Sequence, residues 1–549
     1  MSQRREGEIA GGAQEDKRRA NSSDTAKPPR PDELTASPDE LLAVRTGDAR
    51  TIAGGGAIQI AGQMTNRVLG YLFIAVVAHS LGKAGYGLYR QIFQVLFISM
   101  TLAAGGWPQA AVRFIARART RNDPSGSIGA ARVVLIGSTL TSALVFAAVF
   151  LGAGRLASAF ADAGAEPNDF EYLLRLGAIY IPLYAGMQVL RGCIQAYKAV
   201  VPAVTVANII QPGARLLVGG LAVLAGFGVA GAVGGLVASA AIAVVAGAFF
   251  YRRILTAEGP RAEPKASISE MLRWTIPQTG VGLLGTQSLG LGIILLGVLG
   301  TDADVGVFGV AQALQLAPNV FLTGIVTIWS PVVVELYEKG EIERLTSLYQ
   351  TISRWLATFS FPIFVVLAVE AELFAVLLGG ESARDAAILV TILAAGNVFF
   401  VGTGPSGSLL SMSGRSLMNF FDSLASIVLY LGLGLLFVPK YGVVGMAVVD
   451  AFVTTVINLL RVIQVKVSVG VQPFGRSYFK PVLATAGAGA VLLGLKALLP
   501  DSVLLSLGGI AVAAIVYLVA LRVMGLDDEE RLVWDGIKQR ARKATSRSR

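Results

Sequence analysis

The sequence has a single cysteine, Cys193, and a single histidine, His79. One cysteine excludes an intramolecular disulfide and a cysteine-ligated metal cluster, and one histidine excludes a histidine-rich metal site. The sequence also lacks a GxxxxGK[ST] phosphate-binding loop and offers no Ser/His/Asp set or paired acid/base carboxylates. We therefore expect no cofactor and no metal, no enzymatic activity, and no ATP-driven transport by this chain alone.

Charged residues are also scarce, at 15% of 549 residues, whereas 54% are hydrophobic. With a mean hydropathy of +0.64, this composition is unlike that of a soluble globular protein and predicts an all-α polytopic membrane protein. The 64 glycines suit close helix packing in lipid. The formal net charge of +10 is then assigned to basic cytoplasmic loops, with no nucleic-acid partner expected.

Apolar segments long enough to cross a bilayer recur about fourteen times from residue 51 onward. Residues 1–50 contain no signal-peptide core and are expected to form a disordered cytoplasmic tail. The turn after the second span is basic and the next long turn, around Asp169, is acidic. The positive-inside rule then places both termini in the cytoplasm, in a multi-pass protein of the cytoplasmic (inner) membrane, with 526–549 as a basic cytoplasmic tail.

The chain also repeats itself. LGKAGYGLY at 81–89 resembles LGTDADVGVF at 299–308, and FGVAGAVGG at 227–235 resembles YGVVGMAVV at 441–449, at nearly the same offset. Six helices per repeat predict two pseudo-symmetric lobes of the same orientation, related by an axis along the membrane normal. The expected domains are an N-lobe at 51–267, a C-lobe at 268–470, and two further helices at 471–525.

Four predicted helices carry polar stripes at helical spacing, which indicate a lined central cavity. Arg67 lies near the middle of the first span, where an unpaired charge is costly, so it is expected to face this cavity. A structural alternative is that carbonyls or a carboxylate of a neighbouring helix satisfy Arg67. The candidate substrate-binding residues are Gln59, Gln63, Asn66, Arg67, Arg90, Gln94, Arg215, Gln312, Gln315 and Asn319.

The stripes hold amides and arginines but almost no carboxylate. Amides both donate and accept hydrogen bonds, which suits sugar hydroxyls, and arginine suits phosphate. The pattern therefore favours an anionic, sugar-bearing substrate. Asp422 and Asp450 lie inside predicted helices, where either pairing with a basic neighbour or binding of a coupling H⁺ or Na⁺ is open.

NRVLG at 66–70, LGKAGYGLYR at 81–90 and GWPQAAVRFIA at 106–116 resemble the N-terminal signature of the Wzx-like polysaccharide (O-antigen) flippases of the MOP superfamily, which includes lipid II flippases and MATE drug exporters. The resemblance covers about the first twelve helices. It implies two six-helix lobes in a V around a cavity lined chiefly by helices 1, 2, 7 and 8, with Arg67 contacting a lipid-linked phosphate. Phe73 stands where lipid II flippases have a second arginine, and Gly292 lies near the place where family members often have an aspartate.

The leading hypothesis from the sequence is a flippase that moves a polyprenyl-pyrophosphate-linked oligosaccharide across the membrane by alternating access, with membrane lipid around it. The first alternative is an ion-coupled, MATE-like exporter of small molecules. A membrane glycan polymerase or ligase ranks third, because the longest predicted outside loop, about 155–172, is short.

Overall fold

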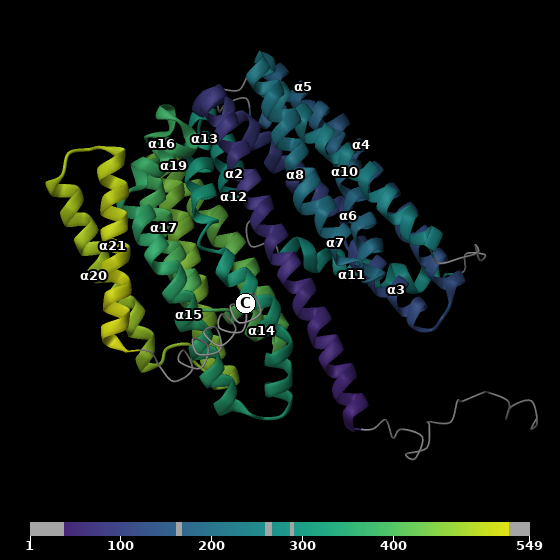
Figure 1. The fold of residues 1–549 in the computed structure, drawn as a ribbon. Coiled ribbons are helices and arrows are strands. Elements are labelled where there is room, and N and C mark those ends of the chain that lie inside the picture. Colours follow the sequence, from purple (N-terminus) through teal and green to yellow (C-terminus); the bar gives the residue numbers. More distant parts are fainter. Residues whose placement is uncertain (1–37, 161–166, 258–265, 286–289, 526–549) are drawn as a thin grey trace, which may run out of the picture. The chain divides into compact units, whose positions relative to one another are not determined.

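The structure is a computed structural model that describes residues 38–160, 167–257, 266–285 and 290–525. Contacts divide the chain into Met1–Ala57 and Ile58–Arg549, and all the packing described below belongs to the second unit. Regular structure in the described ranges is entirely helical (Figure 1). The predicted all-α membrane fold is therefore confirmed.

The first half of the chain supplies long helices joined by short turns. One segment, from Val200 to Phe227, alternates α and π turns. The elements are α2 (Pro38–Ala104), α3 (Trp107–Thr120), α4 (Pro124–Phe160), α5 (Pro167–Ala178), α6 (Tyr180–Ala196), α7 (Val200–Val204), η3 (Thr205–Ile210), α8 (Gln211–Ala214), η4 (Arg215–Gly219), α9 (Gly220–Ala222), η5 (Val223–Phe227) and α10 (Gly228–Ala257).

The second half contains more interrupted helices. Its elements are α11 (Ile268–Gly285), α12 (Leu291–Leu299), α13 (Asp302–Gln315), α14 (Val320–Glu338), α15 (Ile342–Val369), α16 (Ala371–Gly379), η6 (Glu381–Ala383), α17 (Ala386–Gly402), α18 (Ser406–Met412), α19 (Ser416–Val469), η7 (Arg476–Tyr478), α20 (Phe479–Leu498) and α21 (Val503–Met524).

Three of the long helical stretches fold back on themselves at a glycine. Gly82, Gly228 and Gly442 have positive φ values of 67°, 58° and 57°, a conformation that glycine adopts without steric cost. Contacts across each turn show the reversal: the Phe73 and Tyr89 rings lie 5.7 Å apart on either side of Gly82, Gln211 bonds to Ser239 across the turn at Gly228, and Tyr430 bonds to Asp450 in α19. Each stretch is therefore a helical hairpin.

The hairpins account for the predicted number of spans. The described residues contain nine candidate membrane spans, three of which are these hairpins, so counting each hairpin twice gives twelve crossings. If the interrupted pairs α11–α12 and α13–α14, which are not among the nine, each cross once, the total is the predicted fourteen. α2 begins at Pro38, so residues 38–50, which were assigned to the tail, are helical. Residues 1–37 and 526–549 lie outside the described residues.

The backbones of α2 and α13 are in direct contact, shortly after Gly82 in α2 and at the start of α13. A methyl group on Gly87 would overlap the Asp302 carbonyl, and a methyl group on Gly306 would overlap the Lys83 carbonyl. Gln91 also donates to the Asp302 carboxylate over 2.6 Å. These contacts join the two segments that resemble each other in sequence, 81–89 and 299–308. The predicted lobe boundary at 267 falls between α10 and α11.

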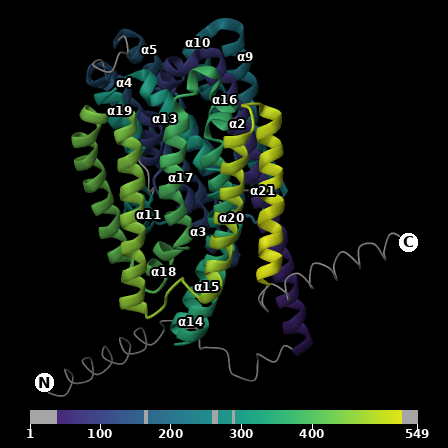
Figure 2. The same cartoon turned by 90° about the vertical axis from the view of Figure 1, so that its left-hand side faces the viewer.

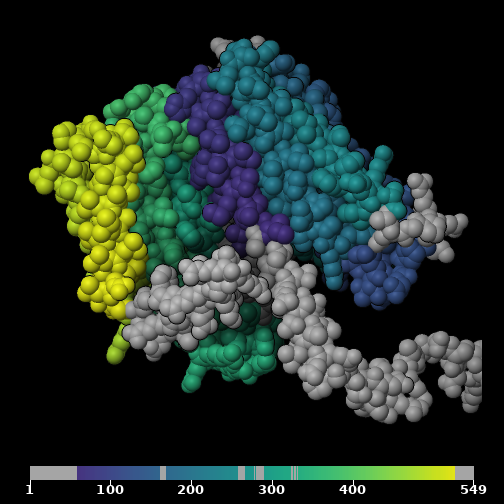
Figure 3. Space-filling view, viewed as in Figure 1, coloured from purple at the N-terminus to yellow at the C-terminus, as the bar shows by residue number. Residues whose placement is uncertain are grey.

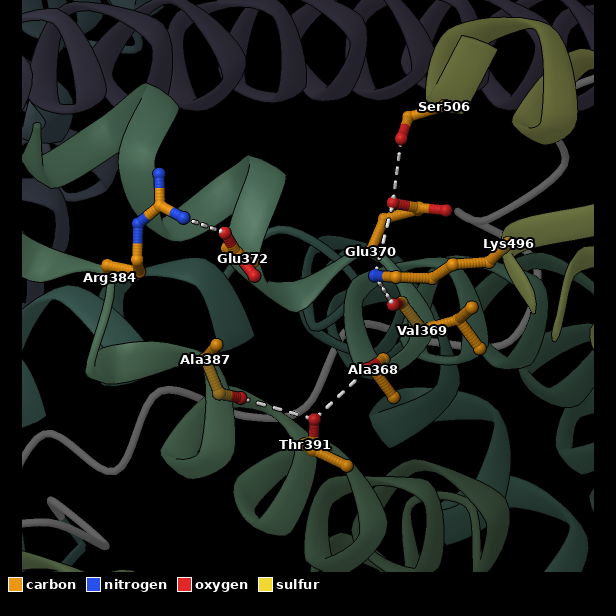
Figure 4. A network of polar contacts seen from close by, with 9 residues as sticks. All are labelled: Ala368, Val369, Glu370, Glu372, Arg384, Ala387, Thr391, Lys496 and Ser506. Carbon is orange, nitrogen blue, oxygen red and sulfur yellow. Dashed lines mark hydrogen bonds and ion pairs between the residues drawn. The ribbon is translucent and has the colours of Figure 1, made fainter. Parts of the chain in front are cut away.

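The last two helices, α20 and α21, lie together against α15 (Figure 1 and Figure 2). In Figure 3 their yellow surface forms one flank. Figure 4 shows the attachment: the buried Glu370 carboxylate accepts from Ser506 at 3.0 Å and lies 3.4 Å from the Lys496 ammonium. Lys496 also donates to the Val369 carbonyl. Tyr517 donates to the Thr358 carbonyl at 2.7 Å.

Candidate functional site

A cavity of about 360 Å³ lies among α2, α12, α13, α17 and α19. It is called the central cavity below. Its volume is within the range of small-molecule sites, about 300–1,000 Å³. Its lining combines aromatic and aliphatic side chains with many polar ones. The polar residues that line it are Arg90, Gln94, Gln312, Gln315, Asn319, Asn397, Ser423, Ser426, Tyr430, Asp450, Thr454, Asn458 and Arg461.

The interruption between α13 and α14 shapes one wall of this cavity. Pro318 lies in the break, and proline cannot continue a helix because it lacks an N–H and clashes with the preceding turn. The carbonyls at the end of α13 find partners outside the helix. Arg67 donates to the Leu316 carbonyl at 2.5 Å, and Tyr71 donates to the Ala313 carbonyl at 3.1 Å. Arg67 and Tyr71 are one turn apart on α2, so together they satisfy the C-terminal end of α13.

This contact corresponds to the structural alternative for Arg67, in which a carbonyl of a neighbouring helix accepts from the guanidinium. The partner carbonyl is 249 residues away in the sequence. Arg67 does not line the central cavity, although Leu316 does. Whether Arg67 also contacts a substrate stays a prediction.

Arg90 is placed in the cavity wall by a bond between α2 and α13. It donates to the Gln312 side-chain oxygen at 3.0 Å, while its Nε is buried without a hydrogen-bond partner in the described structure. Gln94 lies one turn further along α2 and packs on Gly290, where an added methyl group would overlap the amide. Gly290 has a φ of 58° and caps α12. The start of α12 therefore needs glycine both for its backbone and for room for Gln94.

Gln312, Gln315 and Asn319 follow one another at helical spacing, and the last two connect to α17. Gln315 donates to the Val390 carbonyl at 3.1 Å, and Asn319 donates to the Asn397 oxygen at 3.3 Å. The Gln315 Oε1 atom is buried without a hydrogen-bond partner in the described structure. Gln315 thus keeps an unused acceptor at the cavity wall, and a buried unused acceptor favours a ligand that can donate to it.

The two aspartates occupy different environments. Asp422 and Arg461 are both 3% exposed, and Arg461 Nε lies 3.7 Å from Asp422 Oδ2. Gln464 also donates to Asp422 at 2.7 Å. Asp450 instead lines the central cavity and accepts a short hydrogen bond from the Tyr430 hydroxyl. Asp422 therefore has a basic partner, whereas the bonded partner of Asp450 is a neutral phenol.

The other candidate residues lie away from the central cavity lining. Gln59, Gln63 and Asn66 are half-buried on the first arm of α2. Arg215 lies with its guanidinium 5.0 Å above the Phe73 ring, a cation–π arrangement. The structure thus brings Arg90, Gln94, Gln312, Gln315, Asn319 and Asp450 together and leaves Gln59, Gln63, Asn66, Arg67 and Arg215 outside that lining. The binding roles of all of them stay predictions.

The sequence interpretation missed several lining residues on α17 and α19. Thr454, Asn458 and Arg461 continue from Asp450 at intervals of four, four and three residues. This spacing places all four on one helical face, and a search for polar stripes in every span would have found them. Asn397 stands alone in an apolar helix, so no comparable signal marks it.

Known proteins share sequence similarity with this chain. The family described as polysaccharide biosynthesis protein matches residues 52–337. Stage V sporulation protein B of Bacillus subtilis is 22% identical over 524 residues, which cover 88% of this chain and 97% of that protein. Teichuronic acid biosynthesis protein TuaB of the same organism is 25% identical over 220 residues, covering 39% of this chain and 44% of that protein.

Solved structures share the fold at low sequence identity. The lipid II flippase MurJ in an inward closed conformation matches with a TM-score of 0.70 and 13% identity, covering 85% of this chain and 98% of MurJ. An inward-facing multidrug resistance MATE transporter of the MOP superfamily matches with a TM-score of 0.60 and 17% identity, covering 76% of this chain and 98% of the transporter. The resemblance that the sequence motifs indicated is confirmed. Because the family match spans more than half of the chain, this multi-pass membrane protein belongs to the polysaccharide biosynthesis protein family.

Proposed function

We propose that this chain is a flippase that translocates a polyprenyl-pyrophosphate-linked oligosaccharide across the cytoplasmic membrane by alternating access. The observation that supports the proposal most is the lining of the central cavity, where Arg90, with a buried unpartnered Nε, lies among amide side chains and the Gln315 oxygen is an unused acceptor. A sugar–pyrophosphate head group cannot cross hydrocarbon alone, because each charge costs several kcal/mol there. The cavity replaces water around the head group while the prenyl tail stays in lipid.

Different side chains in the cavity suit different parts of the head group. Arg90 can donate to phosphate oxygens in the planar geometry that favours bidentate contacts. Gln312, Gln315 and Asn319 offer amide donors and acceptors that suit hydroxyls. No covalent step is involved, so the chain acts as a transporter rather than as an enzyme.

Asp450 supports ion coupling. It is the cavity-lining carboxylate that accepts from Tyr430, and it can exchange that bond for a proton or Na⁺ as the halves move. The same observation favours the second candidate function, an ion-coupled exporter of small molecules on this fold. An anionic head group needs Arg90, whereas a cationic drug needs Asp450, so the two residues separate the candidates.

The test uses the full chain in proteoliposomes. Translocation of a fluorescent polyprenyl-pyrophosphate oligosaccharide is followed by its protection from a membrane-impermeant quencher. Arg90→Gln is expected to slow translocation roughly tenfold to a hundredfold, as expected for the loss of a charge-assisted hydrogen bond of about 1.5–3 kcal/mol. Arg522→Gln is the matched control, because it removes an exposed arginine at the end of α21.

Arg90→Lys should retain part of the activity, since the charge remains. The wild-type protein could instead fail to translocate this lipid and export a small cation, with Asp450→Asn abolishing the export. That result would favour the exporter function over the flippase function.

A further inference from the structure

A second cavity, of about 400 Å³, lies where α2 ends and α3 begins. It is called the α3 cavity below. α3 packs against both α6 and α11 at this place (Figure 1). Its lining includes one arginine and three glutamines but no carboxylate. The polar lining residues are Thr101, Gln109, Tyr184, Gln188, Arg191, Gln195 and Thr279.

α6 presents the central part of this lining. Gln188, Arg191 and Gln195 are spaced i, i+3, i+7, the spacing of Gln312, Gln315 and Asn319 in the central cavity. Gln188 donates to the Tyr184 hydroxyl at 2.6 Å. Arg191 is half-buried, and its Nε is fully buried without a hydrogen-bond partner in the described structure. A buried guanidinium N–H without an acceptor is costly, so an anion bound at this place would stabilise it.

The start of α3 adds a partial positive charge at the same cavity. Gly105, with a φ of 47°, ends the hydrogen bonding of α2, and α3 begins at Trp107 without a side-chain cap. Gly105, Pro108 and Gln109 line the cavity. The Gly106 N–H donates to Thr279 Oγ1 at 3.0 Å and Pro108 has no N–H, so the start of this 14-residue helix contributes its partial positive charge. Arg191 and this turn therefore favour the same kind of ligand from two sides.

The α3 cavity and the central cavity follow each other along one helix. Phe97 lines the central cavity, and Thr101 lines the α3 cavity one turn later on α2. α3 ends in the basic turn with Arg117 and Arg119, which the positive-inside rule assigns to the cytoplasm. The α3 cavity is therefore the one nearer to the cytoplasmic side under the predicted topology.

We propose that the α3 cavity is a loading site that binds the phosphate groups of the lipid-linked substrate before the head group reaches the central cavity. Arg191 binds phosphate oxygens beside the positive end of α3, and Gln109, Gln188 and Gln195 bind hydroxyls. This inference rests on the proposed flippase function and names a second substrate site for it.

A single engineered cysteine gives a local readout, because Cys193, the sole cysteine in the sequence, is buried. Gln109→Cys places a thiol at an exposed lining position, and Thr120→Cys places a control thiol at the exposed end of α3. Alkylation of each by a maleimide is followed in phosphatidylcholine nanodiscs. The added ligand is either a short-chain polyprenyl pyrophosphate, inorganic pyrophosphate or phosphatidylglycerol.

Polyprenyl pyrophosphate is expected to protect Gln109→Cys and to leave Thr120→Cys unaffected. Adding Arg191→Gln should raise the concentration needed for protection roughly tenfold to a hundredfold, and Arg191→Lys should restore part of the affinity. Arg253→Gln removes an exposed arginine elsewhere and should have no effect. Protection by inorganic pyrophosphate at a higher concentration would assign the affinity to the phosphates, and protection by polyprenyl pyrophosphate alone would add the lipid to the recognised group.

Absence of protection by either pyrophosphate overturns the loading site, as does protection that Arg191→Gln leaves unchanged or that phosphatidylglycerol reproduces. Thermal unfolding of each variant shows that the protein is folded. If the pyrophosphates do not protect Gln109→Cys while flipping still depends on Arg90, the loading site is contradicted and the proposed function is not. Absence of flipping by the wild-type protein contradicts the proposed function instead.

Discussion

Arg67 donates to a backbone carbonyl at the break between α13 and α14. Its guanidinium donates to the Leu316 carbonyl, and Tyr71 donates to the carbonyl one turn earlier in α13. Backbone groups released by a break inside a membrane need such partners, because lipid offers none. The arginine that stood out in the sequence for its cost in lipid is thus used to connect the first arm of α2 to α13.

Replacing Arg67 tests this contact. Arg67→Gln should lower the free energy of unfolding by about 1 kcal/mol, because the bond is charge-assisted but partly exposed. It should also slow translocation roughly tenfold, since the position of Leu316 in the cavity wall depends on it. Arg67→Lys should lose less of both. Thermal unfolding and flipping are measured on one preparation, and a glutamine variant that matches the wild type in both would contradict the role.

Asp422 and Asp450 should respond differently to the same change. Asp422→Asn leaves the buried Arg461 without its counter-charge and is expected to cost about 3–5 kcal/mol of stability. Asp450→Asn keeps an acceptor for Tyr430 and should leave the unfolding temperature nearly unchanged while it abolishes the dependence of transport on a proton or Na⁺ gradient. Equal destabilisation by both substitutions would argue against separate roles.

At the scale of elements, the attachment of α20 and α21 depends on one buried carboxylate. Glu370 is 3% exposed and receives both Lys496 and Ser506 (Figure 4). Glu372, two residues later, pairs with Arg384 at 2.5 Å on the exposed side. Buried and exposed ion pairs differ in how much their loss costs, so these two neighbours form a natural comparison.

Glu370→Gln is expected to lower the free energy of unfolding by about 1–2 kcal/mol, because Lys496 is itself about a third exposed. Glu372→Gln, the matched control, should change it by about 0–1 kcal/mol. Denaturation in detergent, followed by the fluorescence of a label on α21, measures both. If the two substitutions have equal effects, Glu370 does not hold the final helices in place.

Helix number and the stripe of Gln312, Gln315 and Asn319 could be predicted from the sequence, because long apolar segments and helical spacing depend only on local pattern. The use of Arg67 could not, since its partner is a carbonyl 249 residues away that is freed by a break at Pro318. Arg215 was assigned to the cavity by its spacing, but the same helical face also passes Phe73. The stripe of Gln188, Arg191 and Gln195 on α6 also has helical spacing, so it could have been predicted from the sequence.

At the scale of the whole molecule, an even number of crossings predicts that both termini lie on the same side of the membrane. Reporter fusions after Arg121 and after Asp169 should fall on opposite sides, the first in the cytoplasm, because the basic turn at Arg117–Arg121 is retained inside. Alkaline phosphatase and green fluorescent protein fusions, active on opposite sides, report the location. Two fusions on the same side would contradict the number of crossings before Asp169.

The contact between α2 and α13 also has a two-fold pattern. Gly87 faces the Asp302 carbonyl while Gly306 faces the Lys83 carbonyl, and 83 and 302 are separated by the same number of residues as 87 and 306. Each position thus meets the counterpart of its neighbour, as in the isologous interface of a two-fold symmetric homodimer. Such a surface is self-complementary. This is the pattern that we expect if the two predicted six-helix halves arose by duplication of one chain that paired with itself.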